Sequence, residues 1–421
     1  MLIFTTVLRE ILKVVYFITV IAISVSWDFQ INPFAKATET IQIDLLSKTI
    51  LSVEPPNQVV SQAVNLPTIE QIKRIASEQK ATLIYYSINQ DLNQEVELLI
   101  WAIQPTGQVE LRRQELKSLK ISLADLVTQA RESIRGSSTN NLRNQGRELQ
   151  QLYQILIEPI AELLPKQPES RVIFIPQSSL FLVPFAALID RQGKYLIEAH
   201  TILTAPSIQV LDLTHQRRRQ IQGLTQDVLI VGNPTRQQPE LLPSLPGAQQ
   251  EAIAIAQIFN TQPLLGSNAT KAAVLQKMPN SRIIHLATHT FINEIQGLES
   301  GLALTPSEND NGILTAAEIL DLRLNAELVV LSGDNTGLGQ ITGDGVIGLS
   351  RSFMAAGVPS VIVSLWTVPD VPTAELMIEF YRFWQQKPDK AQALRQSMIK
   401  TMKKYPHPRD WAGFTLIGEA E

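Results

Sequence analysis

The chain has 421 residues, of which 44% are hydrophobic and 18% are charged, and this composition excludes a disordered or low-complexity protein. Its 36 basic and 40 acidic residues give a formal net charge of −4, so nothing attracts the chain to nucleic-acid phosphates in general and we expect no nucleic-acid partner. The chain contains no cysteine, which excludes disulfides, thiolate metal sites and a cysteine nucleophile.

The first 37 residues have the pattern of a targeting segment. An apolar run from Val14 to Val25 follows two basic residues, as the apolar core of a signal peptide follows its charged end. Ala35 to Ala37 form a small-x-small cleavage pattern. We therefore predict that residues 1–37 are a signal peptide and that the protein is exported. The alternatives are an uncleaved membrane anchor, with residues 1–27 as the tether, and a buried first helix.

Residues 38–74 are polar and contain Pro55-Pro56, which is typical of a linker. The segment after them, residues 75–220, starts with β-rich runs separated by turn residues and continues with two stretches of helical spacing. The predicted strands cover residues 81–87, 95–103 and 108–111, and the predicted helices cover residues 122–135 and 147–164.

The pattern changes at residue 171, where short continuous apolar runs begin to alternate with helical segments. Continuous hydrophobicity indicates strands buried on both faces, so the runs predict a mainly parallel sheet between helices. The second half of the folded part is residues 221–421. The predicted strands cover residues 171–175, 227–231, 282–287, 327–331 and 360–365, and the predicted helices cover 247–259, 269–277, 315–320, 345–356 and 373–386.

Two of the most apolar runs are followed by polar residues. His289 comes shortly after the run at 282–287, and Ser332 to Gly337 follow the run at 327–331. Ligands and substrates of open α/β sheets bind outside the carboxyl ends of the strands. The two polar segments are therefore the first candidates for a functional site.

Several motifs in this order give the chain a resemblance to the CHAT domain, a caspase-like, peptidase-related domain often found beside tetratricopeptide repeats. The resemblance spans roughly residues 75 to 420 and implies a caspase-like α/β/α sandwich with a mainly parallel sheet in two subdomains. The motifs lie at Leu182 to Leu188, Gly232 to Pro234, Leu245 to Glu251, His285 to His289, Leu331 to Gly337, Ser364 to Asp370 and Trp411 to Gly418.

The resemblance also implies where a histidine and cysteine dyad would lie. The family histidine precedes a glycine and falls on His289, but the next residue here is Thr290. The family cysteine lies in a motif like Leu-Ser-Ala-Cys-Glu-Thr-Gly. In that motif Leu331, Ser332, Thr336 and Gly337 match, whereas Gly333, Asp334 and Asn335 replace alanine, cysteine and glutamate.

A cysteine peptidase attacks with a thiolate that a nearby histidine helps to form, and a carboxylate cannot follow that cycle. An ionised Asp334 would only accept hydrogen bonds, and we expect it to form an ion pair with a protonated His289. We therefore expect no peptidase activity. The resulting hypothesis is a peptide- or protein-binding or scaffold module that uses the remnant cleft around His289, Asp334 and Asp370, with Thr290, Ser332, Gly333 and Asn335 as further binding residues.

Other functions stay open. Asp334 with His289 could support a hydrolase of non-cysteine mechanism, Ser332 could be a nucleophile, or the domain could be purely structural. Asp370 could recognise a basic group or cap a helix.

The sequence predicts neither a metal nor another cofactor. His285 and His289 are four residues apart in an extended segment, which spans about 13 Å at about 3.3 Å per residue, and this distance is too long for a shared zinc. Gly343 to Gly348 match GxGxxG, but no strand leads directly into them, as a dinucleotide site requires.

Overall fold

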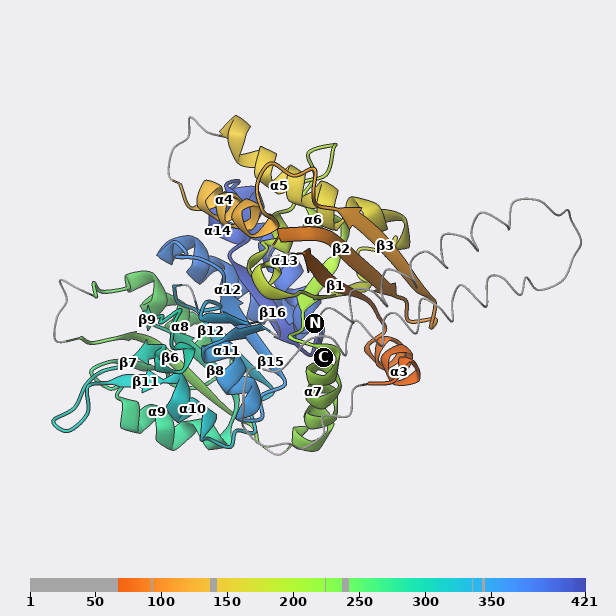
Figure 1. Cartoon of the computed structure of the whole chain (residues 1–421). Helices are drawn as coiled ribbons and strands as arrows, with labels where there is room; N and C mark the ends of the chain where they lie inside the picture. Colours follow the sequence, from red (N-terminus) through yellow and green to blue (C-terminus); the bar gives the residue numbers. More distant parts are fainter. Residues whose placement is uncertain are drawn as a thin grey trace, which may run out of the picture. The chain divides into compact units, whose positions relative to one another are not determined.

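The computed structural model describes residues 67–91, 94–136, 142–223, 225–236, 242–334, 336–342 and 345–421 (Figure 1). The predicted targeting segment 1–37 and most of the predicted linker 38–74 lie outside these residues, as does Asn335. Among the described helices, none is both long enough and apolar enough to cross a bilayer.

An 11-stranded sheet runs through the described part of the chain. It is mainly parallel, and antiparallel pairs occur where β1, β2 and β3 adjoin and where β16 joins β15. In spatial order the strands are β3 (Val109–Glu115), β2 (Gln94–Ile103), β1 (Ala81–Asp91), β4 (Arg171–Ile175), β5 (Thr201–Thr204), β16 (Phe414–Gly418), β15 (Ser360–Ser364), β12 (Leu328–Leu331), β8 (Ser281–Ala287), β6 (Asp227–Pro234) and β7 (Leu264–Gly266).

Helices cover both faces of this sheet (Figure 1). They are α3 (Ile69–Gln79), α4 (Leu123–Arg135), α5 (Leu142–Leu156), α6 (Leu196–Ala199), α7 (Ile208–Ile221), α8 (Pro246–Ile258), α9 (Lys271–Lys277), α10 (Ala316–Leu320), α11 (Leu349–Ala355), α12 (Asp370–Gln386), α13 (Lys390–Lys404) and α14 (Pro408–Trp411).

Strand β12 shows why the sheet needs two helical layers. Its four residues are fully buried, and alternate side chains enter two different cores. Leu328 and Val330 pack in the core that contains residues of α8 and α12. Val329 and Leu331 pack in the core that contains residues of α9, α10 and α11. Each such side chain contributes roughly 1.5–3 kcal/mol when it leaves water, so a continuous apolar run is stable only between two layers.

The predicted linker ends in a helix. Thr68 caps α3 by accepting from Gln71 N at 3.3 Å, and the Gln71 side chain accepts from Thr68 N at 2.7 Å. Ile69 and Ile72 are buried against the sheet. The linker prediction is therefore wrong from residue 69 onward, because two polar capping residues and widely spaced isoleucines hid an amphipathic helix.

The predicted helix over 345–356 begins only at Leu349. Before it, β14 (Gly345–Ile347) pairs antiparallel with β13 (Gln340–Thr342). The GxGxxG pattern therefore falls in a hairpin, and its residues 343 and 344 lie outside the described part.

The two predicted halves, 75–220 and 221–421, share the same sheet. The first half supplies β1 to β5 and the second supplies β6, β7, β8, β12, β15 and β16. They meet where β5 and β16 pair in parallel at the single position Ile417 and Thr204.

Candidate functional site

The candidate site lies where β6, β8, β12 and β15 end. These strands are parallel neighbours, so their carboxyl ends lie along the same edge of the sheet. His289 follows β8, Asp334 follows β12, and Asp370 begins α12 after β15. The segment between β6 and α8 adds Pro243 to the same edge.

His289 is half-buried, and one nitrogen of its ring lies at hydrogen-bond distance from a main-chain oxygen. Nε2 lies 2.7 Å from the main-chain oxygen of Pro243, a hydrogen-bond distance. The main-chain oxygen of His289 accepts from Ala303 N at 2.9 Å. One ring nitrogen is therefore directed at a main-chain carbonyl.

The Asp334 carboxyl is half-buried and accepts a hydrogen bond from Val368 N at 3.1 Å through Oδ1. Burial raises the pKa of this carboxyl, whereas the Val368 N–H and the charge of His289 act in the opposite direction. Within the described residues no hydrogen bond or ion pair joins Asp334 to His289. The predicted ion pair is therefore not formed, because His289 Nε2 points to Pro243 and Asp334 Oδ1 is held by Val368.

Two of the residues that depart from the family motifs tie the site loops together. The Thr290 hydroxyl donates to the main-chain oxygen of Asp334. A Cβ atom at Gly333 would lie 2.2 Å from the main-chain oxygen of Thr288, so the alanine of the family motif does not fit here without a shift of the loop. The Ser364 hydroxyl donates to the main-chain oxygen of Gly333. The exchanges at positions 290 and 333 thus suit a closely packed loop.

The rest of the loop after β12 is fastened to β15. Thr336 N donates to Ser364 Oγ at 2.9 Å, and Ser364 N donates to Thr336 Oγ1 at 2.7 Å. Ser332 is 5% exposed, and its hydroxyl lies beside Glu251 below the surface. Among the predicted binding residues, Ser332 is therefore buried beneath the loop.

Asp370 holds the start of α8. Its carboxyl accepts from Gly247 N at 2.6 Å and from Ala248 N at 2.9 Å. A negative charge at this position also interacts favourably with the helix dipole. A Cβ atom at Gly247 would lie 2.5 Å from Asp370 Cγ, so glycine is what allows this approach. Of the two predicted roles for Asp370, helix capping is the one with visible partners, although the capped helix is α8 instead of its own.

We expect Asp370→Ala to lower the free energy of unfolding by about 1–2 kcal/mol, because two N–H groups of α8 lose their acceptor. Asp370→Asn keeps an acceptor oxygen and should cost less. Denaturant unfolding of both variants measures the difference. An Asp370→Ala protein as stable as the native chain would contradict the capping role.

A buried polar cluster lies beneath the site. Glu251 Oε1 is 2.8 Å from His285 Nε2, and His285 Nδ1 is 3.1 Å from Tyr381 Oη. His285 and Glu251 are 0% and 1% exposed. Burial raises the pKa of Glu251, and His285 and Ser332 offset part of that effect. The cluster joins α8, β8 and α12 directly below the loop that carries Asp334.

A carboxylate oxygen of Glu251 lies 2.8 Å from His285 Nε2 and occupies the space beside this nitrogen. In the described part of the chain, no three His, Asp or Glu side chains come together as metal ligands would.

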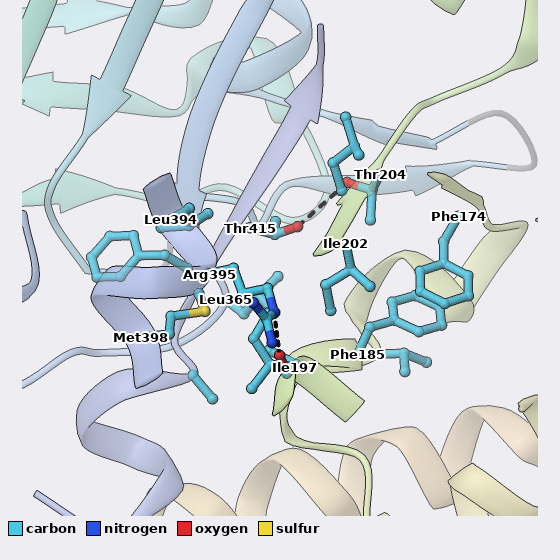
Figure 2. A pocket seen from close by; sticks show the side chains of 15 residues that line it. Phe174, Phe185, Ile197, Ile202, Thr204, Leu365, Leu394, Arg395, Met398 and Thr415 are labelled. Atoms are coloured by element: carbon cyan, nitrogen blue, oxygen red, sulfur yellow. Dashed lines mark hydrogen bonds between the residues drawn. The ribbon is translucent and has the colours of Figure 1, made fainter. Parts of the chain in front are cut away.

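A pocket of the fold lies away from the candidate site, where β5 meets β16 (Figure 2). Phe174 and Phe185 stack at one side, with ring centroids 4.1 Å apart. Arg395 stands at the other side and donates to the main-chain oxygens of Ile197 at 2.8 Å and Glu198 at 2.6 Å. Neither this pocket nor a second one beside it contains His289, Asp334 or Asp370.

Comparisons with known proteins agree with this architecture. The tetratricopeptide repeat protein 28 of Homo sapiens is 31% identical and that of Mus musculus 29% identical, each over 64% of this chain. The chain spans only 13% of the length of these relatives. The separase of the Saccharomyces cerevisiae separase–securin complex superposes with a TM-score of 0.55 at 12% identity, over 89% of this chain and 33% of that one.

The likeness to separase concerns the fold and confirms the predicted caspase-like α/β/α sandwich with a mainly parallel sheet. The family model of the CHAT domain matches residues 146–419, from α5 through β16. It therefore includes every candidate site residue from His289 to Asp370. The chain belongs to the CHAT domain family.

Proposed function

We propose that this protein is a noncatalytic CHAT domain that binds a peptide or protein segment at the strand ends around His289 and Asp334. The observation that carries the proposal is the state of Asp334. The motif resemblance assigns it the position of the family cysteine, and its carboxyl accepts a hydrogen bond from Val368 N in a chain that has no cysteine at all. Thiolate attack has no nucleophile here.

The loops around this position support a binding role. Thr290, Gly333 and Ser364 connect the segment after β8, the loop after β12 and the end of β15 through side-chain and main-chain contacts. A set of loops fixed in this way is preorganised, and preorganisation lowers the entropy cost of binding. The relatives are named for tetratricopeptide repeats, which form extended binding surfaces, and this context also favours a role in protein assembly.

A hydrolase of non-cysteine mechanism is the competing proposal. The raised pKa of Asp334 is the observation that favours it, because a carboxyl with a raised pKa is better suited to proton transfer near neutral pH. Against it, His289 Nε2 is directed at Pro243, and no hydrogen bond within the described residues links His289 to Asp334.

Mass-spectrometric analysis of a diverse peptide library incubated with the full chain distinguishes the two proposals. We expect no cleavage by the native protein. Asp334→Cys tests whether the ancestral geometry survives, and Asp321→Cys, which places a thiol on an exposed residue elsewhere, is its matched control. Cleavage by the native protein that disappears in both His289→Ala and Asp334→Asn would overturn the noncatalytic proposal.

A further inference from the structure

The segment that follows His289 is rich in exposed apolar side chains. Over the described residues, seven large apolar side chains are exposed, and three of them lie in the segment that directly follows this histidine. They are Phe291 at 41%, Ile295 at 81% and Leu298 at 41%. A fourth, Val371 at 57%, lies in the first turn of α12. Clustered exposed apolar side chains mark interaction sites more often than scattered ones do.

The segment that carries them is ordered by its own hydrogen bonds. Asn293 Oδ1 accepts from Ile295 N at 3.0 Å and from Gln296 N at 2.8 Å. Asn293 N donates to Ser300 Oγ at 3.0 Å, and Asn293 Nδ2 donates to Glu299 Oε2 at 2.9 Å. One asparagine thus fixes both ends of the turn. Ile295 is held out in solvent by a defined loop, so its exposure is not the result of a frayed chain.

The same segment begins with a strand that has an unpaired side. In the small sheet, β9 (Thr290–Phe291) pairs with β10 (Gly301–Ala303), which pairs with β11 (Ile313–Thr315). The order is β11, β10, β9, so β9 is an edge strand within the described part of the chain. An edge strand offers main-chain groups to which an extended peptide can add.

The negative charge of residues 290–301 indicates the charge of a partner that would bind there. Residues 290–301 contain Glu294 and Glu299 but no lysine or arginine. Asp334 adjoins the start of this segment, because the Thr290 hydroxyl donates to its main-chain oxygen. Arg131 of α4 interacts electrostatically with Glu294 and offsets part of this negative charge. A cationic partner is therefore favoured over an anionic one.

We infer that Thr290 to Glu299 form a docking surface for an extended peptide segment with alternating apolar and basic side chains. The apolar side chains would cover Ile295 and Leu298, and the basic ones would meet Glu294 and Asp334. This inference rests on the proposed function, because it names the kind of segment that binds beside His289.

The test measures fluorescence anisotropy of a labelled peptide, Gly-Leu-Lys-Val-Lys-Leu-Gly, with the full chain. We expect saturable binding that weakens when glutamate replaces both lysines or proline replaces the central valine. Ile295→Ser and Leu298→Ser should each weaken binding about tenfold or more, because each removes an apolar anchor without changing the charge of the surface. Leu213→Ser, at a position 62% exposed on α7, is the matched control and should have no effect.

Asp334→Arg, measured in parallel, separates this inference from the proposed function. If both Ile295→Ser and Asp334→Arg weaken binding, the inference and the proposed function both stand. If only Asp334→Arg does, the docking surface is wrong and the proposed function stands. If only Ile295→Ser does, the apolar contacts of the docking surface stand, whereas the contact with Asp334 and the proposed site around it are wrong. No binding by the native chain, or equal binding of the glutamate peptide, overturns the inference.

Discussion

Replacing Lys390 with methionine is expected to raise the free energy of unfolding at pH 7 by about 2 kcal/mol. The Lys390 side chain, at the start of α13, is only 1% exposed. Burial is the main cause that lowers the pKa of its ammonium group from 10.5 to about 8. Methionine has a similar length and no charge, so it removes the cost of burying a cation. The variant loses the hydrogen bond from Lys390 Nζ to the main-chain oxygen of Glu421, and this loss reduces the gain in the free energy of unfolding.

The direction of the pKa shift also predicts a pH dependence. Between pH 8 and 10.5 the unfolded chain keeps the Lys390 proton while the folded chain releases it. The unfolded state then binds more protons, so the stability of the native chain rises with pH across this window. Lys390→Met should lack that rise.

Denaturant unfolding from pH 7 to 10.5 tests this contribution of Lys390. Lys403→Met, at an exposed position of the same helix, controls for the general effect of removing a positive charge. A Lys390→Met protein that is less stable than the native chain at pH 7 would show that the buried cation is fully compensated by its surroundings.

The sequence predicts the central strands well because their signal is local. Strands such as β12 are apolar at every position, and this pattern follows from burial on both faces whatever the neighbours are. Helix α13 gives no such signal, because Lys390 and Arg395 lie on its buried side and conceal its apolar periodicity. Arg395 is buried since it donates to main-chain oxygens of Ile197 and Glu198, a contact that only the folded chain creates.

The sequence also predicts only part of the candidate site. The polar segments after two apolar runs predict that His289 and Asp334 lie at one edge of the sheet, and the structure has them there. Their partners are the main-chain groups of Pro243 and Val368, which carry no side-chain signal in a sequence. Glu251 gives one clue, since it is the only carboxylate in α8 and has apolar neighbours on its buried side.

The largest change in stability that we expect comes from leaving the Glu251 carboxylate without its partner. His285→Leu should lower the free energy of unfolding by about 3–5 kcal/mol, because it leaves the Glu251 carboxylate buried without its partner. The same change removes His285 Nδ1, which lies 3.1 Å from Tyr381 Oη and is its hydrogen-bond partner. Glu251→Leu alone should be costly for the corresponding reason, since His285 then loses its carboxylate partner.

The double variant Glu251→Leu with His285→Leu should be more stable than His285→Leu alone. Replacing a buried ion pair with apolar side chains of similar size is often neutral or stabilising, whereas breaking the pair is not. A thermodynamic cycle over the two single variants and the double variant, measured by denaturant unfolding, gives the coupling between the two side chains. A coupling near zero would mean that the 2.8 Å contact contributes nothing to stability.

The pH dependence of His285→Leu tests the same point independently. Burial raises the pKa of Glu251, so the folded chain binds a proton at this carboxyl more tightly than the unfolded chain does. The free energy of unfolding must then fall as pH rises, and the variant should regain stability as the solution is made more acidic. Because the double variant has no carboxyl at position 251, it should not show this recovery, and a recovery of equal size in both proteins would assign the effect to other groups.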